Sequence, residues 1–190
     1  NIILRLEKLL DQSAQGRILK EGINTVIVGK PNAGKSSLLN LLVGEDKAIV
    51  TDVAGTTRDV LEENIRLQGI SLNLIDTAGI RFTEDTVEKI GVEKAKKYAL
   101  DADLLIYVVD GSVPLDESDY EILNLISGKK VIILLNKTDL DMVVTEDILL
   151  SEIAGTCKDA VEKASDIMVI RTSTKENTGI DIFADKVKEM

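Results

Sequence analysis

The sequence predicts an α/β fold, in which a mostly parallel six-stranded sheet carries helices on both faces. From Ile23 onward, short apolar runs suited to buried strands alternate with segments of helical periodicity, the pattern typical of such a sheet. A glycine-rich turn joins the first strand-like run to the first helix, and polar clusters follow the third, fifth and sixth runs. Because ligands of open α/β sheets bind at strand ends, these clusters contain the candidate site residues.

Each expected strand is an apolar run bounded by turn residues. The expected strands span residues 23–28, 61–67, 70–75, 104–109, 131–135 and 167–170. Gln68-Gly69 separates the second run from the third, so we expect these two strands to form a hairpin. The expected helices span residues 36–42, 87–100, 116–126, 145–164 with an interruption near Gly155, and 181–188.

Residues 1–22 precede the sheet, and we expect them to be separate from a main domain at 23–190. Ile2, Leu6, Leu9 and Leu10 recur at helical spacing, which predicts an amphipathic helix running to about Gln15. Two interpretations stay open: a helix that packs on its own domain, or the stub of a neighbouring helical domain. The chain opens on Asn1 rather than Met, so it is expected to be an excised fragment.

Composition narrows the classes of function. A formal charge of −10 argues against gripping RNA or anionic lipid through their phosphates. No apolar run approaches the roughly 18 residues of a membrane span, so no membrane partner is expected. The single cysteine, Cys157, cannot form an internal disulfide, which fits a cytoplasmic location and is equally compatible with a small packing residue.

The glycine-rich turn Gly29-Lys30-Pro31-Asn32-Ala33-Gly34-Lys35-Ser36 fits the P-loop pattern. The glycines let backbone N–H groups point at phosphate oxygens, Lys35 reaches the β- and γ-phosphates, and the Ser36 hydroxyl ligates Mg²⁺. The alternative is a turn matched by chance, which the flanking strand and helix disfavour. The expected phosphate contacts are Asn32, Ala33, Gly34, Lys35, Ser36 and Ser37.

Asp76-Thr77-Ala78-Gly79 follows the third expected strand. Asp76 can hold Mg²⁺ through water, and the Gly79 N–H can sense a γ-phosphate. Alone, this short pattern is no more than a strand-terminating turn. It gains meaning because its strand is expected to lie beside the strand that leads into the P-loop.

Asn136-Lys137-Thr138-Asp139 follows the fifth expected strand. The Asp139 carboxylate can accept hydrogen bonds from N1–H and the 2-amino group of guanine, a pattern that adenine lacks, so the ligand is expected to be GTP or GDP. Ser173-Thr174-Lys175 after the last strand can add a backbone N–H to the guanine 6-oxo group, the alternative being an ordinary polar loop.

The segment from Thr51 to Asp59 lies between the first helix and the second strand. A threonine here can close over Mg²⁺ and the γ-phosphate. Thr57 is the expected metal ligand, and Thr56 is expected to lend backbone contacts to the reaction. Arg58 is more simply explained as a solvated or strand-pairing residue than as an arginine finger.

Four sequence blocks resemble the translation-factor branch of the Ras-like GTPases, and within it the G domain of the MnmE (TrmE) tRNA-modifying family. They are G-K-P-N-A-G-K-S-S-L-L-N, I-V-T-D-V-A-G-T-T-R-D-V, D-T-A-G-I-R and V-E-K-I-G-V-E-K-A. The resemblance covers nearly the whole chain, so 23–190 would be the G domain. The final motif departs slightly from the family pattern, with Thr174 where alanine is usual.

The resemblance implies how GTP is hydrolysed. Ile80 stands where Ras places a water-orienting glutamine, and an isoleucine cannot polarise water. The family's substitute is the glutamate that here is Glu88, acting through a bridging water, although a solvated helix-surface glutamate is the simpler interpretation without the resemblance. A potassium ion would be held by the Asn32 side chain and by backbone carbonyls at Thr51 and Val53.

The family's partners complete these expectations. By resemblance, the protein dimerises through the nucleotide face of its G domain and works with MnmG to modify the wobble uridine of certain tRNAs, which other domains or the partner would contact. Lys35, Thr56 and Glu88 are the residues expected to carry hydrolysis. The alternative function is a ribosome-assembly GTPase of the Era or EngA type; a metabolic kinase is disfavoured by the guanine-type N-K-T-D motif.

Overall fold

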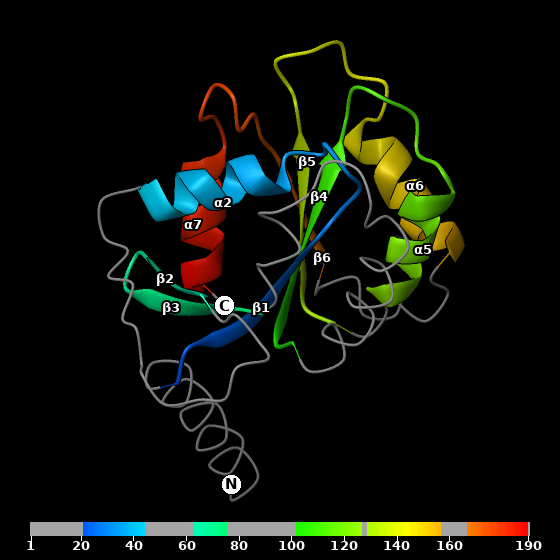
Figure 1. Ribbon diagram of the computed structural model, residues 1–190. Helices are drawn as coiled ribbons and strands as arrows, with labels where there is room; N and C mark the ends of the chain where they lie inside the picture. The colour runs from blue at the N-terminus through cyan, green and yellow to red at the C-terminus, as the bar shows by residue number, and fades with distance from the viewer. Residues whose placement is uncertain (1–20, 45–62, 76–101, 127–128, 157–166, 190) are drawn as a thin grey trace, which may run out of the picture.

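The computed structural model describes residues 21–44, 63–75, 102–126, 129–156 and 167–189. Within these residues, six strands form one sheet in the order β2-β3-β1-β4-β5-β6 (Figure 1). The strands are β1 (Ile23–Val28), β2 (Glu63–Leu67), β3 (Ile70–Leu74), β4 (Leu104–Asp110), β5 (Val131–Asn136) and β6 (Ile167–Arg171). The predicted α/β fold and its six strands are confirmed.

The sheet is parallel except at one edge. β1 pairs in parallel with β3 and β4, and β4–β5 and β5–β6 are parallel as well. β2 and β3 pair antiparallel, with Leu67 opposite Ile70 across the turn, so the predicted hairpin is confirmed. Gln68 and Gly69 in that turn both have positive φ angles, of 47° and 91°, as a two-residue hairpin turn requires.

Helices cover both faces of the sheet (Figure 1). The helices are α2 (Lys35–Gly44), α5 (Glu117–Leu125), α6 (Glu146–Thr156) and α7 (Ile180–Glu189). α2 and α7 pack on one face through side chains such as Leu38 and Phe183, and α5 and α6 pack on the other through Leu123 and Leu149.

β4 shows why the central strands read as continuous apolar runs. Leu104, Ile106 and Val108 belong to the core beneath α2 and α7, whereas Leu105, Tyr107 and Val109 belong to the core beneath α5 and α6. Successive side chains of a strand point to opposite faces, so a strand buried on both faces needs apolar residues at every position. The sheet centre is therefore a rigid base for the loops at its ends.

The helix ends follow local capping chemistry. α5 begins after Asp116, whose carboxylate accepts the N–H groups of Ser118 and Asp119, while the Asp119 carboxylate accepts the Asp116 N–H. This reciprocal arrangement is a capping box. α6 begins at Glu146, one residue after the expected start at 145, and it continues through Gly155 to end at Thr156. The rest of the expected helix 145–164 lies outside the described residues, as do the expected helices before Gln15 and at 87–100.

Among the described residues, no helix is long and apolar enough to cross a membrane.

Candidate functional site

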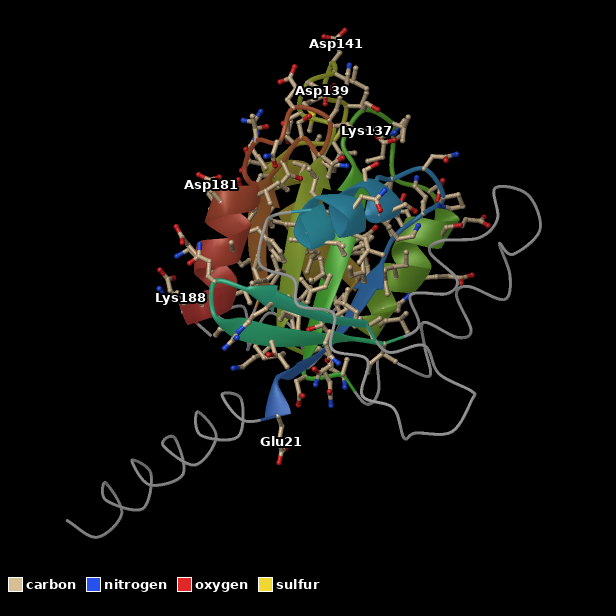
Figure 2. All side chains as sticks on the ribbon, turned by 60° about the vertical axis from the view of Figure 1, so that its left-hand side comes forward. Glu21, Lys137, Asp139, Asp141, Asp181 and Lys188 are labelled. Atoms are coloured by element: carbon tan, nitrogen blue, oxygen red, sulfur yellow. The ribbon has the colours of Figure 1, made fainter. Side chains whose placement is uncertain are left out.

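Four parallel strands end at the same edge of the sheet, and their loops form the candidate site. β1 leads into the glycine-rich loop, β4 ends at Asp110, β5 ends at Asn136, and β6 is followed by Thr172 and Ser173. Lys137 and Asp139 lie at this end of the molecule, and Glu21 lies at the opposite end (Figure 2). The sheet thus brings together residues that are about a hundred positions apart in the chain.

The glycine-rich loop takes a backbone shape that its glycines allow. Gly34 has φ +107°, and a Cβ there would overlap the side-chain nitrogen of Asn136. Gly29 has φ +151°, and a Cβ there would overlap the carbonyl oxygen of Val108. Asn32 also has a positive φ, of 59°, a conformation that asparagine adopts more readily than most residues. Both glycines are therefore fixed by close neighbours as well as by backbone strain.

Lys35 bends back over the loop that carries it. Its Nζ donates to the carbonyl oxygens of Gly29, at 2.7 Å, and of Lys30, at 2.5 Å. Burial lowers the pKa of Lys35 from 10.5 to about 8, because a desolvated ammonium is disfavoured. An anion placed beside this ammonium would relieve that penalty, so the geometry favours phosphate.

The first turn of α2 provides further groups for an anion. Ala33 is buried, and Ser36 and Ser37 are exposed at the start of the helix, where backbone N–H groups and the helix dipole favour negative charge. The predicted Mg²⁺ ligands are hydroxyl and carboxylate oxygens, which suit that hard cation. Ser36 is the one described member of that set, since Thr57 and Asp76 lie outside the described residues.

The Asn136 side chain joins the glycine-rich loop to the loop after β6. Its Nδ2 donates to the Ala33 carbonyl at 2.8 Å and to the Thr174 hydroxyl at 3.3 Å. Its Oδ1 accepts from the Thr174 N–H at 3.0 Å and from the Thr172 hydroxyl at 3.4 Å. Asn136 is 0% exposed, so these contacts satisfy an amide that would otherwise be buried without partners.

Asp139 is held in place by the residues that the sequence placed near the base. The Ser173 hydroxyl donates to its Oδ1 at 2.7 Å, and Lys175 Nζ lies 3.5 Å from its Oδ2. The Ser173 hydrogen bond is the main cause that lowers the pKa of Asp139. The carboxylate therefore stays ionised at neutral pH, as a hydrogen-bond acceptor for N–H donors must.

The structure reduces the set of residues in the loop after β6 whose backbone N–H could bind the base. The Ser173 N–H donates to the Thr178 carbonyl at 3.1 Å, and the Thr174 N–H donates to Asn136. Of the three residues Ser173, Thr174 and Lys175, two therefore have their N–H groups engaged within the protein. Lys175 is the remaining candidate for the guanine 6-oxo group.

Lys137 has a partner that the sequence analysis missed. Its Nζ lies 2.6 Å from Asp110 Oδ2, and the Ser112 N–H and hydroxyl donate to Asp110 Oδ1 at 3.0 and 2.6 Å. Although burial opposes ionisation, the hydrogen bonds from Lys137 and Ser112 lower the pKa of Asp110. An aspartate at the end of an otherwise apolar strand was the sequence signal that could have identified it.

Several predicted site residues lie outside the described part of the chain. They are Thr51, Val53, Thr56, Thr57, Asp76, Gly79 and Glu88. The described chain ends here at Ile75, the residue before Asp76, which donates its N–H to the Thr25 carbonyl of β1 at 3.0 Å.

The described residues thus form a site with two chemically different ends. One end has the Lys35 ammonium and the N-terminus of α2, which suit phosphates. The other has the ionised Asp139 carboxylate, which suits a base with two adjacent N–H donors. Asn136 connects the two ends, and the arrangement can bind a guanine nucleotide.

Comparison with known proteins agrees with this geometry. The model of a family described as "50S ribosome-binding GTPase" matches residues 24–137. A tRNA modification GTPase MnmE from Lachnoclostridium phytofermentans is 50% identical over 188 residues, which is 99% of this chain and 38% of the relative. The MnmE of Finegoldia magna is 51% identical over 189 residues, which is 100% of this chain and 39% of the relative.

A solved structure supports the same fold. Era in complex with MgGDPNP and nucleotides 1506–1542 of 16S ribosomal RNA superposes with a TM-score of 0.56 at 28% identity, over 87% of this chain and 55% of Era. The chain spans about two fifths of the length of the curated relatives it matches. It belongs to the matching family of GTP-hydrolysing enzymes, and its predicted resemblance to the MnmE tRNA-modification GTPases is confirmed over nearly its whole length.

Proposed function

We propose that this chain is the GTP-binding and GTP-hydrolysing switch of a tRNA-modification protein. The observation that carries the proposal is the Asn136 side chain, which binds Ala33 of the phosphate end and Thr174 of the base end. A ligand that spans both ends must carry phosphates and a base. The identity of about 50% with MnmE proteins supports the biological role.

At the phosphate end, Lys35 moves from the carbonyls of Gly29 and Lys30 to the β- and γ-phosphates. The loop N–H groups and the N-terminus of α2 complete the cradle. Ser36, Thr57 and Asp76 hold Mg²⁺, which neutralises charge on the β- and γ-oxygens. Gly79 reports the presence of the γ-phosphate through its N–H.

At the base end, the Asp139 carboxylate accepts from N1–H and the 2-amino group of guanine. Ser173 holds one carboxylate oxygen and Lys175 lies near the other. Lys137, oriented by Asp110, flanks the base. Adenine offers the Asp139 carboxylate no such pair of N–H donors, and the loss of these two hydrogen bonds provides the selectivity.

Hydrolysis needs a group that replaces the glutamine of Ras, since Ile80 cannot orient water. We assign this role to Glu88, acting on the attacking water through a second water, with Thr56 contributing backbone contacts. Asn32, through its side chain, and Thr51 and Val53, through their backbone carbonyls, would hold K⁺, because a hard cation prefers such oxygen ligands. The ion would supply the additional positive charge that the site needs. The exposed Asn32 side chain of the loop is accessible for this contact.

The role proposed for the whole protein rests on its resemblance to the MnmE family. Residues 23–190 act as the G domain, and residues 1–22 belong to a neighbouring helical domain. Two G domains associate through their nucleotide faces in K⁺, and the cytoplasmic protein works with MnmG on the wobble uridine of tRNA. The chain's charge of −10 is consistent with tRNA being bound elsewhere.

A ribosome-assembly role of the Era or EngA type is the alternative. The 28% identity and common fold with Era favour it, but the match to MnmE is closer and extends over more of the chain.

Replacing Na⁺ by K⁺ tests the proposed switch. GTP turnover should rise about tenfold or more in K⁺, because the site otherwise lacks a cation beside the β–γ bridge. Turnover is measured at matched ionic strength, with association of the protein followed in a transition-state mimic. Equal rates in the two salts would contradict the K⁺ site.

The Glu88→Ala substitution should lower turnover by about a hundredfold to ten-thousandfold, the range that general-base or water-orienting help provides. GTP affinity and K⁺-dependent association should stay close to wild type, because this carboxylate adds no attraction to the ground state. Single-turnover hydrolysis and direct titration measure the two effects. Glu84→Ala is the matched control and should stay near wild type. If the two variants hydrolyse GTP equally fast, Glu88 is an ordinary surface residue and the catalytic assignment is wrong.

The Asp139→Asn substitution should weaken GTP binding by about a hundredfold and strengthen binding of xanthosine triphosphate. The 2-oxo group of xanthine accepts a hydrogen bond from the new amide, whereas the 2-amino group of guanine loses its acceptor. Titration with both nucleotides measures the exchange of preference. Unchanged GTP affinity would remove Asp139 from the base site.

The pKa of Lys35 predicts how binding depends on pH. The free protein loses the Lys35 proton at about pH 8, and phosphate binding restores the charged form, so affinity must fall as pH rises through that pKa. GDP affinity should decrease about fourfold between about pH 7 and pH 8.5. Lys35→Arg, which keeps its charge, should give a weaker dependence in the same titration; identical profiles would contradict the role of Lys35.

A further inference from the structure

Lys30, the second residue of the glycine-rich loop, forms ion pairs with the N-terminal end of α5. Its Nζ lies 2.6 Å from Asp119 Oδ2 and 2.9 Å from Asp116 Oδ2. Both carboxylates belong to the first turn of α5 and its cap. The Lys30 and Asp119 side chains are 12% and 1% exposed, so this ion pair is largely shielded from the solvent screening that weakens surface ion pairs, whereas the Asp116 side chain is 58% exposed.

Asp119 is the buried centre of this contact. Its side chain is 1% exposed, and its Oδ1 accepts the hydroxyl of Tyr107 at 2.7 Å. Its Oδ2 accepts the backbone N–H of Asp116 as well as facing Lys30. A buried carboxylate costs several kcal/mol unless it is paired and hydrogen-bonded. If Lys30 moved away, the buried Asp119 carboxylate would lose its ion pair, and the folded state would be destabilised.

The backbone of Lys30 contacts the residue that binds phosphate. Its carbonyl oxygen accepts Lys35 Nζ at 2.5 Å and the Ala33 N–H at 3.3 Å. The side chain of Lys30 thus points to α5 while its carbonyl points into the loop. The conformation of Lys30 therefore links its ion pair with Asp119 to the contact between its carbonyl and Lys35.

We propose that Lys30 is a positioning residue, whose ion pair with Asp119 fixes the glycine-rich loop and the position of Lys35 for phosphate binding. The network Tyr107–Asp119–Lys30 links β4, α5 and the loop, and it acts on the phosphates without touching them. The inference rests on the proposed function, since it requires that the loop binds phosphate. Its consequence is specific: loss of the network weakens the contacts to phosphate and leaves recognition of the base intact.

The two lysines of the loop are chemically distinct in the way this role requires. Although burial lowers the pKa of Lys30, hydrogen bonds to Asp119 and Asp116 raise it above 10.5, so Lys30 stays charged and paired. Lys35 faces carbonyl oxygens and has its pKa lowered to about 8. Lys30 is suited to hold the loop, and Lys35 is suited to exchange its partners for a phosphate.

The experiment compares GDP with guanosine, which lacks phosphates, in titrations of matched variants. Lys30→Met leaves the Asp119 carboxylate unpaired and can impair folding, so the main variant is Lys30→Met/Asp119→Asn, in which both charges are removed together. It should bind GDP about tenfold or more weakly and guanosine within about twofold of wild type. Lys30→Arg should restore GDP binding to within about threefold.

Glu117→Gln is the control, because it removes an exposed carboxylate from the same turn of α5; it should bind GDP as wild type does. If the double variant does not fold, Tyr107→Phe decides, with an expected loss in GDP affinity of about threefold. Wild-type GDP affinity in the deciding variant, or equal losses for GDP and guanosine, would overturn the inference. Lys35→Ala separates failure of the proposed function from failure of the Lys30 inference. Normal GDP binding by Lys35→Ala would refute the phosphate site itself. Loss of GDP binding would support the phosphate site, so that the other variants then test only the role of Lys30.

Discussion

The buried amide of Asn136 is the contact on which the rest of the site depends. It bonds the carbonyl of Ala33 on one side and the backbone and hydroxyl groups after β6 on the other. The close approach also explains Gly34, since a Cβ there would overlap the amide nitrogen. Asn136 belongs to the motif that the sequence assigns to the base. In the structure, its hydrogen bonds hold the phosphate end and the base end at a fixed distance from each other.

These hydrogen bonds of Asn136 can form because the register of the sheet fixes where each strand ends relative to its neighbours. Asp110 of β4 lies opposite Asn136 of β5, and Val28 of β1 lies opposite Tyr107 of β4. A shift of register by one residue would exchange the side chains that pack in the two cores and would move Asp110 away from Asn136. The observed register of the strands thus places Lys137 beside Asp110 and the glycine-rich loop beside Asn136.

The same reasoning separates what the sequence could predict from what it could not. The strands and the helices that the structure describes follow from local periodicity, and the hairpin follows from Gln68-Gly69. The strands, α2, α5 and α7 were therefore predicted close to their observed bounds, as was the start of α6. Asp110 and Thr172 were missed as site residues, because their roles arise from pairing between strands far apart in the chain. Asp119 was missed for the same reason: on its own helix it reads as an N-terminal capping residue, and its contact with Lys30 needs the tertiary fold.

Three lysines at the candidate site, Lys30, Lys35 and Lys137, differ in how their charge is compensated, which bears on how a chain with a formal charge of −10 can bind a polyanion. Lys30 is paired with Asp119 and Asp116, and Lys137 is paired with Asp110, so within the described residues each of these charges is largely neutralised by its partners. Within the described residues, Lys35 Nζ donates to carbonyl oxygens, which solvate an ammonium without cancelling its charge. Burial lowers the pKa of Lys35 to about 8. Because the neighbouring lysines are already satisfied, the attraction for phosphate is concentrated on Lys35, and a small, correctly placed positive charge outweighs the repulsion of a distant, solvent-screened negative surface.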